Sequence, residues 1–330
     1  MFERLTDVDL TAPTRTTPAI VIVRRAALCA YAVVLVWSCV TVGVPIADDR
    51  LFVFAVAGLL CASIGRPRRQ LRDLVVDWAP FVVMILGYDY SRGWAQRVGL
   101  GVHFQPQITA DRVLFGGHVP TVWLQEHLYT VVPGPVPLPA GAAQWWEVAL
   151  QLVYVSHFVA WIAVAAVLWA SSRHRFHWYV RRLVTLSYLA FVTYVVFPAA
   201  PPWMAAQYGF LPATVGRFGR GLDVIGLRVV GDLVTDGAKT QNQVAAVPSL
   251  HFGFALLIVV TLWPHVKPAA RRWLAAYPVA MALVLVITGE HYVIDLVLGA
   301  LYVAASCAVW RSIEARRAVR SFARRGGSLS

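Results

Sequence analysis

The sequence predicts an all-α polytopic membrane protein with about eight transmembrane helices. Its 330 residues are 58% hydrophobic and only 14% charged, and the mean hydropathy is +0.62. These values lie well outside those of ordinary soluble domains. The arginines that dominate the net charge of +12 gather in the gaps between apolar runs. This pattern is typical of membrane flanks, so no nucleic-acid partner is expected.

Each long apolar run predicts one helix, and a spanning helix needs about 20 residues. The expected helices lie near residues 26–46, 51–64, 74–88, 147–171, 182–200, 250–266, 272–288 and 290–310. The second and third runs are short and could form one re-entrant pair. In that case six helices span the membrane, and the orientation of the others is unchanged.

The distribution of Lys and Arg predicts the orientation, because cytoplasmic loops carry an excess of these residues. Most of the 29 Lys and Arg fall in alternate gaps and at the two ends, within residues 4–25, 66–72, 173–182, 267–272 and 311–325. Both termini are therefore expected in the cytoplasm. A tail, 1–25, would precede a single transmembrane domain, 26–310, and a basic tail, 311–330, would follow it. The long loops 89–146 and 201–249 are then expected on the outer face.

The first long loop contains HVPTVWLQEHLY, residues 118–129, which predicts a short amphipathic helix. Its apolar stripe would lie opposite Gln125 and Glu126 and would consist of Trp123, Leu124, Leu128 and Tyr129. Such a helix could lie in the membrane interface. An ordinary surface helix gives the same pattern.

Two histidines stand at the outer ends of predicted helices that are far apart in the sequence. His251 opens the sixth run and His291 the eighth, and Asp295 follows His291 by four residues. This spacing would place His291 and Asp295 on one helix face, where the carboxylate can accept the proton of one ring nitrogen. The other ring nitrogen is then free to act as a nucleophile. Ionisable groups within such apolar runs usually mark a functional site.

The stretch AVPSLHFGFALL, residues 246–257, predicts a helix start that could bind an anion. Pro248 and Ser249 precede the apolar run, and Ser is a favoured helix cap. The first free N–H groups of such a helix point toward an incoming phosphate. His251 would stand beside that phosphate as a general acid for the leaving alcohol, and later as the base for an acceptor hydroxyl.

Other interpretations of these residues stay open at this point. A single histidine at a helix start is more often an interfacial or capping residue, and His157, near the middle of the fourth run, fits a packing role better than a catalytic one. A metal site is the main rival, with His251, Glu290, His291 and Asp295 as ligands. The spacing disfavours it, because Glu290 would point about 100° away from His291 on a helix.

The same residues resemble motifs of the type-2 phosphatidic acid phosphatase superfamily. Its second motif reads Pro-Ser-Gly-His, and its third reads Ser-Arg, five residues, His, three residues, Asp. The matching segments here are residues 248–251, PSLH, and 291–295, HYVID. Leu250 replaces the Gly, Leu285 stands where the third motif has Arg, and the first motif, Lys-x6-Arg-Pro, is not found.

With these departures, the sequence resembles one branch of that superfamily, the inositol phosphorylceramide synthases and inositol phosphotransferases. This branch also lacks the Ser-Arg pair. The similarity extends over about 190–300 and includes YVVFPAAPPW, residues 194–203. The resemblance implies that His291 is the phosphorylated nucleophile, that Asp295 orients it and that His251 is the acid and base.

A phosphate also needs positive charge, and several outer residues could supply it. Arg92, beside Asp89 just past the third run, is the first candidate, and a bidentate arginine suits phosphate best. The alternatives lie in the second outer loop: Arg217, Arg220 and Lys239. Ser249 is expected to contribute through its place at the helix start.

These features predict a membrane enzyme whose transmembrane domain cleaves a lipid phosphate ester at the outer face of the plasma membrane through a phosphohistidine. The resemblance to the inositol phosphotransferase branch implies that it is a phosphotransferase, which passes an inositol-phosphate-like headgroup to a hydroxyl. No metal or cofactor is expected, because a helix terminus and an arginine can neutralise the developing charge. Hydrolysis of a lipid or polyprenyl phosphate by water is the alternative. A proton-coupled transporter fits less well, because the ionisable cluster lies at one face and no repeat is visible. The oligomeric state is not predicted.

Overall fold

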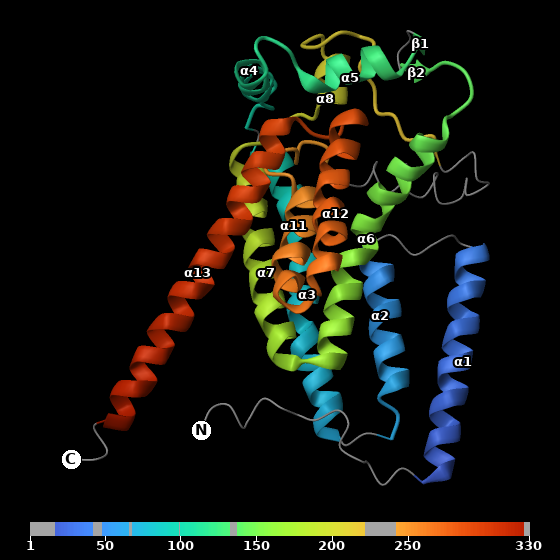
Figure 1. Cartoon of the computed structure of the whole chain (residues 1–330), viewed down its shortest axis with the longest axis vertical. Coiled ribbons are helices and arrows are strands. Elements are labelled where there is room, and N and C mark those ends of the chain that lie inside the picture. The colour runs from blue at the N-terminus through green and yellow to red at the C-terminus, as the bar shows by residue number, and fades with distance from the viewer. Residues whose placement is uncertain are drawn as a thin grey trace.

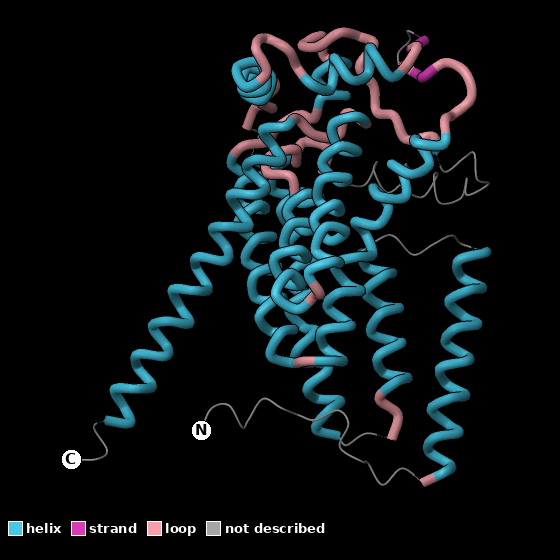
Figure 2. The backbone as a smooth tube through the Cα atoms, in the orientation of Figure 1, coloured by secondary structure: helices cyan, strands magenta, loops and turns pink. Residues whose placement is uncertain are grey.

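Helices make up most of the chain in the computed structural model, which describes residues 17–41, 48–65, 68–98, 100–132, 137–221 and 242–326 (Figures 1 and 2). The long helices are α1 (Pro18–Thr41), α2 (Asp48–Ala62), α3 (Arg68–Val98), α6 (Trp145–Ser171), α7 (Arg173–Val196), α11 (Leu250–Leu262), α12 (Pro268–Ile287) and α13 (Val293–Gly326). The short elements are α4 (Gln105–Leu114), α5 (Pro120–Leu128), α8 (Pro202–Gln207), the 3-10 helix η1 (Trp263–His265) and the strand pair β1 (Val131–Val132) and β2 (Leu138–Pro139).

The long helices follow the predicted apolar runs, and most of them run roughly parallel to the long axis of Figure 1, whereas α13 is inclined away from the others. Within the described ranges, five helices are long and apolar enough to cross a membrane: α1, α6, α7, α12 and α13. The apolar parts of α2 and α11 are shorter. The predicted all-α polytopic membrane architecture is therefore confirmed, while the number of spans stays a prediction.

The core of the bundle forms around α7, which packs against α3, α6, α11 and α13. Trp78 and Phe81 of α3 are buried against Trp161 of α6 and Phe176 of α7, and their rings make tilted contacts 5.1 to 6.3 Å apart. Burial of such large apolar side chains supplies most of the packing energy of a helix bundle. By contrast, α1 packs on α2 and lies at the edge of the bundle (Figure 1).

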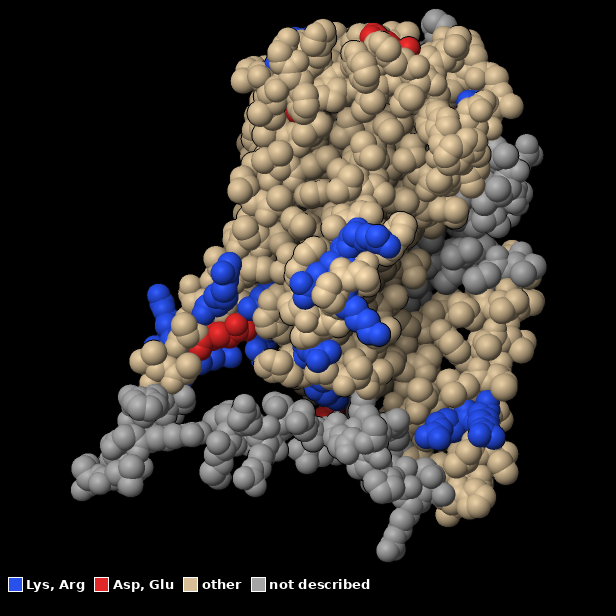
Figure 3. All heavy atoms as spheres, viewed as in Figure 1, with Lys and Arg blue, Asp and Glu red and all other residues tan. Residues whose placement is uncertain are grey.

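One end of the bundle is basic, and its helices are connected by ion pairs in which at least one partner is buried. In the view of Figure 3, most Lys and Arg atoms lie in the lower half, near the start of α12 and the lower parts of α1 and α13. Arg182 of α7 is 1% exposed and donates to Glu314 of α13 at 3.0 Å. Asp77 of α3 accepts from His177 at 2.8 Å and pairs with Arg173, both on α7. This charge separation is what the orientation prediction requires.

The opposite end is closed by the short elements α4, α5, α8, β1 and β2 with their connecting segments, which we call the cap (Figure 1). Both predicted outer loops contribute to it. Its segments join the bundle at Ala199, which forms bridges with His103 and Ala245. Proline-rich residues 198–202 end α7 and begin α8, as the inability of consecutive prolines to continue a helix predicts.

Helix α5 confirms the predicted helix at 118–129 but not its predicted faces. Gln125 was expected on the polar side, yet it is 1% exposed, whereas Trp123 is 49% exposed. The Gln125 side chain donates to the carbonyls of Gly216 and Ile287, both at 2.9 Å, and accepts from the Gly216 N–H at 3.0 Å. The polar side chain therefore faces inward, because it satisfies backbone groups of the neighbouring loops.

Candidate active site

The start of α11 has the predicted form. Ser249 is fully buried, and its hydroxyl accepts from the N–H of Phe252 at 3.4 Å, so it caps the helix. The Ser249 N–H donates to the carbonyl of Asp295 at 3.1 Å. This bond ties the beginning of α11 to the beginning of α13 and brings the two predicted motifs together.

His291 does not lie on a helix, and the prediction that it opens one was wrong. The preceding helix, α12, ends at Ile287, and Gly289 follows with φ +75°, a left-handed conformation that favours glycine and stops a helix. The N–H groups of Glu290 and His291 both donate to the Leu285 carbonyl, and α13 begins only at Val293. His291 therefore stands in the turn between the two helices.

The expected pairing of His291 with Asp295 forms nevertheless. Nδ1 of His291 lies 3.3 Å from Oδ2 of Asp295, and the same oxygen accepts from the Tyr292 N–H at 2.9 Å. Asp295 is fully buried and His291 is 5% exposed. The carboxylate thus caps its own helix and fixes the orientation of the imidazole in one arrangement.

The second histidine faces the first. Nδ1 of His251 lies 3.4 Å from Nε2 of His291, although the two residues are 40 positions apart. A hydrogen bond between two ring nitrogens requires that one of them carries the proton and the other accepts it. The chain Asp295–His291–His251 is therefore a continuous line of proton-sharing groups.

Two residues of α6 complete this cluster and were missed from the sequence. The ring of His157 lies 4.2 Å from that of His251, and the ring of Tyr154 lies 5.5 Å from it. The sequence favoured a packing role for His157 because it stands in the middle of an apolar run. The spacing of Tyr154 and His157, three residues apart on one helix face, was the available signal.

Of the predicted cations whose side chains the structure describes, Arg217 is the one near this cluster. Its Nε donates to Glu290 at 2.5 Å, and its guanidinium lies 5.7 Å from the Trp203 ring. Burial acts to lower the pKa of Arg217, but the neighbouring Glu290 and Tyr154 outweigh it, so the pKa is raised and the charge persists. Tyr154 is therefore a neighbour of both Arg217 and His251.

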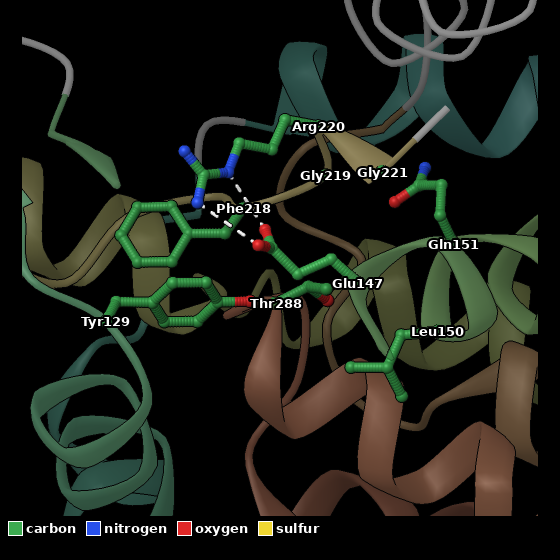
Figure 4. A pocket seen from close by; sticks show the side chains of 9 residues that line it. All are labelled: Tyr129, Glu147, Leu150, Gln151, Phe218, Gly219, Arg220, Gly221 and Thr288. Atoms are coloured by element: carbon green, nitrogen blue, oxygen red, sulfur yellow. Dashed lines mark hydrogen bonds and ion pairs between the residues drawn. The ribbon is translucent and has the colours of Figure 1, made fainter. Parts of the chain in front are cut away.

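Arg220 is engaged elsewhere in the cap, at the pocket shown in Figure 4. It holds Glu147 with two hydrogen bonds, at 2.9 and 3.1 Å, and donates to the carbonyls of Pro139 and Gly141. These bonds join the loop after α8 to the start of α6 and to β2. No contact between Arg220 and the histidine cluster is found among the described residues.

Three other predicted residues cannot be compared in this way. Asp89 and Arg92 belong to α3, which continues to Val98 instead of ending near residue 88, but their side chains lie outside the described part of the chain. Lys239 also lies outside the described residues. Over the described ranges, no group of three or more His, Cys, Asp or Glu side chains is arranged to hold a metal ion.

Comparison with known proteins identifies the family of the chain. The family model of the PAP2 superfamily matches residues 124–309, more than half of the chain, and this range contains His251, His291 and Asp295. A phosphoinositol dihydroceramide synthase of Bacteroides thetaiotaomicron is 25% identical over 265 residues, which cover 75% of this chain and 79% of that protein. No solved structure matches the chain significantly. The chain therefore belongs to the PAP2 superfamily, as its motifs predict, and is an enzyme that acts on a lipid phosphate ester.

Proposed function

We propose that this enzyme transfers a phospho-headgroup from a lipid donor to a hydroxyl acceptor through a phosphohistidine at His291. The observation that carries the proposal is the line of Asp295, His291 and His251, with contacts of 3.3 and 3.4 Å. An oriented imidazole with a second imidazole at its reactive nitrogen has the arrangement of a nucleophile and an acid–base partner.

The first half-reaction forms the phosphoenzyme. The carboxylate of Asp295 accepts a hydrogen bond from Nδ1–H of His291, so the lone pair of Nε2 is free to attack phosphorus. The bond from phosphorus to the leaving oxygen breaks as the new bond to Nε2 forms. His251 acts in its imidazolium form, gives one proton to the departing lipid alcohol and becomes neutral.

The second half-reaction reverses these roles. His251 takes the proton of the acceptor hydroxyl, whose oxygen attacks phosphorus and releases His291. The acceptor decides whether the enzyme is a transferase or a phosphatase, because water can take the place of the hydroxyl. The relative's name, phosphoinositol dihydroceramide synthase, supports transfer of inositol phosphate to a ceramide-like alcohol.

The phosphoryl group must enter between the two histidines. Their facing nitrogens are 3.4 Å apart, and a reacting phosphorus itself needs about 3 to 3.5 Å from the nucleophile. Substrate binding therefore has to separate His251 from His291, and the shared hydrogen bond describes the enzyme without substrate.

Arg217 and the start of α11 would neutralise the phosphate. The guanidinium has donors beyond the Nε that binds Glu290, and planar donor pairs suit phosphate oxygens. The Ser249-capped end of α11 adds its helix dipole at the same place.

The topology belongs to the same proposal. A single catalytic domain, 26–310, would sit in the plasma membrane with its cap and active site outside and both termini in the cytoplasm. The distance of the basic end from the histidine cluster supports this orientation. In a cysteine-free background, Arg112→Cys on the cap should react with a membrane-impermeant thiol reagent in intact cells. The matched variant Arg175→Cys, at the basic end, should react only after lysis, and the opposite result would invert the orientation.

The chemistry is tested with a donor labelled in its phosphate. His291→Ala should abolish turnover and labelling of the protein, whereas His251→Ala should let an acid-labile phosphoenzyme accumulate slowly. Chelation by EDTA should leave turnover unchanged, because the scheme has no metal step. Activity in His291→Ala, or loss with EDTA that a divalent metal restores, would contradict the phosphohistidine route.

A further inference from the structure

We propose that Asp111, on α4 of the cap, is a positioning residue that holds the start of α13 where His291 can meet His251. The inference rests on the proposed function for the role of His291. Asp111 precedes the residues matched by the superfamily model, 124–309, so the family match does not include it.

The contact is a helix cap supplied from a distant part of the chain. Asp111 is fully buried, and its carboxylate accepts from the N–H of Val293 at 3.1 Å and from the N–H of Ile294 at 2.9 Å, one bond to each oxygen. These N–H groups open α13 and have no partner within the helix. A carboxylate at this end is also favoured by the helix dipole.

The capped residues lie between the two partners of the catalytic pair. His291 precedes Val293 by two positions, and Asp295 directly follows Ile294. Asp295 itself accepts from the Tyr292 N–H, so two carboxylates hold three consecutive N–H groups. If Val293 and Ile294 were released, the turn and the first residues of α13 could shift. That shift would disturb the contact between His291 and Asp295.

The helix that carries Asp111 is a firm support. Ile108, one turn before Asp111, is 1% exposed and belongs to the same apolar cluster as the fully buried Tyr292, next to His291. Val119 and Ala205 complete the packing around them from the rest of the cap. The cap thus fixes the start of α13 by packing through Tyr292 and by hydrogen bonds through Asp111.

The capping also decides where the phosphate can bind. With the N–H groups of residues 292–294 already bonded to carboxylates, the start of α13 has no free donors at these positions and carries negative charge. A substrate phosphate must therefore rely on the start of α11 and on Arg217. Asp111 contributes to the reaction only through the position of the other residues.

The test compares Asp111→Ala and Asp111→Asn with Gln107→Ala in the full-length enzyme. Gln107 is a matched control, since it is 3% exposed on the same helix, one turn earlier, and donates to the His103 carbonyl instead of α13. The measurements are kcat, KM for the lipid donor, and hydrogen exchange of the peptide that contains Val293 and Ile294.

We expect Asp111→Ala to lower kcat about 10- to 100-fold with KM changed less than about threefold, as loss of a cap and misplacement of a reacting group imply. Exchange at Val293 and Ile294 should become faster. Asp111→Asn keeps one acceptor oxygen and should lie between Asp111→Ala and the wild type, which keeps the test valid if Asp111→Ala folds poorly. Gln107→Ala should change neither kcat nor this exchange.

Two results would overturn the inference. One is a normal kcat in Asp111→Asn and in folded Asp111→Ala despite faster exchange at Val293 and Ile294. The other is an equal loss of kcat in Gln107→Ala, which would make the effect a general property of α4. His291→Ala, assayed in parallel, separates this inference from the proposed reaction. Activity of His291→Ala would contradict the reaction, while the exchange measurement would still test whether Asp111 holds the start of α13.

Discussion

Replacement of Asp295 by asparagine tests how the carboxylate serves the proposed nucleophile. One oxygen of Asp295 accepts from both the Tyr292 N–H and Nδ1 of His291, while Oδ1 is buried and has no hydrogen-bond partner within the described part of the chain. An asparagine can place its carbonyl oxygen at the Oδ2 position and keep both contacts. The substitution therefore removes the charge and preserves the geometry.

The size of the effect follows from the separation of the charges. The positive charge of a phosphorylated or protonated imidazole is spread over the ring, so it lies about 4 Å from the carboxylate that touches it. At an effective dielectric of about 20, that pair is worth about 4 kcal/mol, or about 10³-fold in rate. The loss should be smaller than the roughly 10⁴-fold seen when asparagine forces the wrong histidine tautomer in Ser-His-Asp triads.

The assay is steady-state turnover of a labelled lipid donor, with the yield of phosphoenzyme in a single turnover. We expect kcat of Asp295→Asn to fall about 10³-fold with little change in KM, because the charge matters most once the imidazole becomes cationic. Asp77→Asn is the matched control. It removes a buried carboxylate charge at the basic end, and should lower stability without lowering kcat of the folded enzyme.

A folded Asp295→Asn enzyme whose kcat stays within about tenfold of the wild type would refute the electrostatic role. In that case Asp295 would act as a cap for the Tyr292 N–H, and the activation of His291 would have to come from His251 or from the substrate.

Two further predictions concern the framework around the site. Gln125→Leu leaves three buried backbone groups without the Gln125 side chain as partner and should cost about 2 to 4 kcal/mol of stability, which thermal denaturation measures. It should also raise KM for the lipid donor, measured by donor titration, because the loop that carries Arg217 is released. Glu314→Gln should destabilise the protein by about 3 kcal/mol, because it leaves the buried charge of Arg182 without its carboxylate partner. Arg182→Met should cost only about 1 kcal/mol, because the Glu314 side chain that then loses its partner is 38% exposed. Equal losses in these last two variants would contradict that asymmetry.

The sequence predicted the positions of the long helices because hydrophobicity alone determines them. It placed their ends less well where a single glycine decides the outcome. The run from 290 onward looked like one helix, but Gly289 stops α12 and the chain forms a turn before α13 begins. His291 and Asp295 still meet, because a turn followed by the first residues of a helix brings positions four apart into contact.

The contact of His291 with Asp295 could be predicted from the sequence, since charged groups stand out in apolar runs. The residues of α6 could not be separated from packing residues, because a buried tyrosine or histidine looks the same in either role. Asp111 and Gln125 left even less signal. Asp111 accepts from backbone N–H groups, and Gln125 binds backbone N–H and carbonyl groups. Because nearly every residue type offers these backbone groups, the sequence of the partner segment gives no sign of such a contact.

This last point explains why the cap is needed. The candidate active site is built on irregular backbone, at residues 288–292 and 212–218, near the end of an apolar bundle. Lipid beside such a bundle cannot satisfy free N–H and carbonyl groups. Asp111 satisfies the start of α13, and Gln125 satisfies both the loop of Gly216 and the end of α12. The first long loop therefore does more than connect α3 to α6. Its buried polar side chains allow the turn that carries His291 to exist beside the membrane.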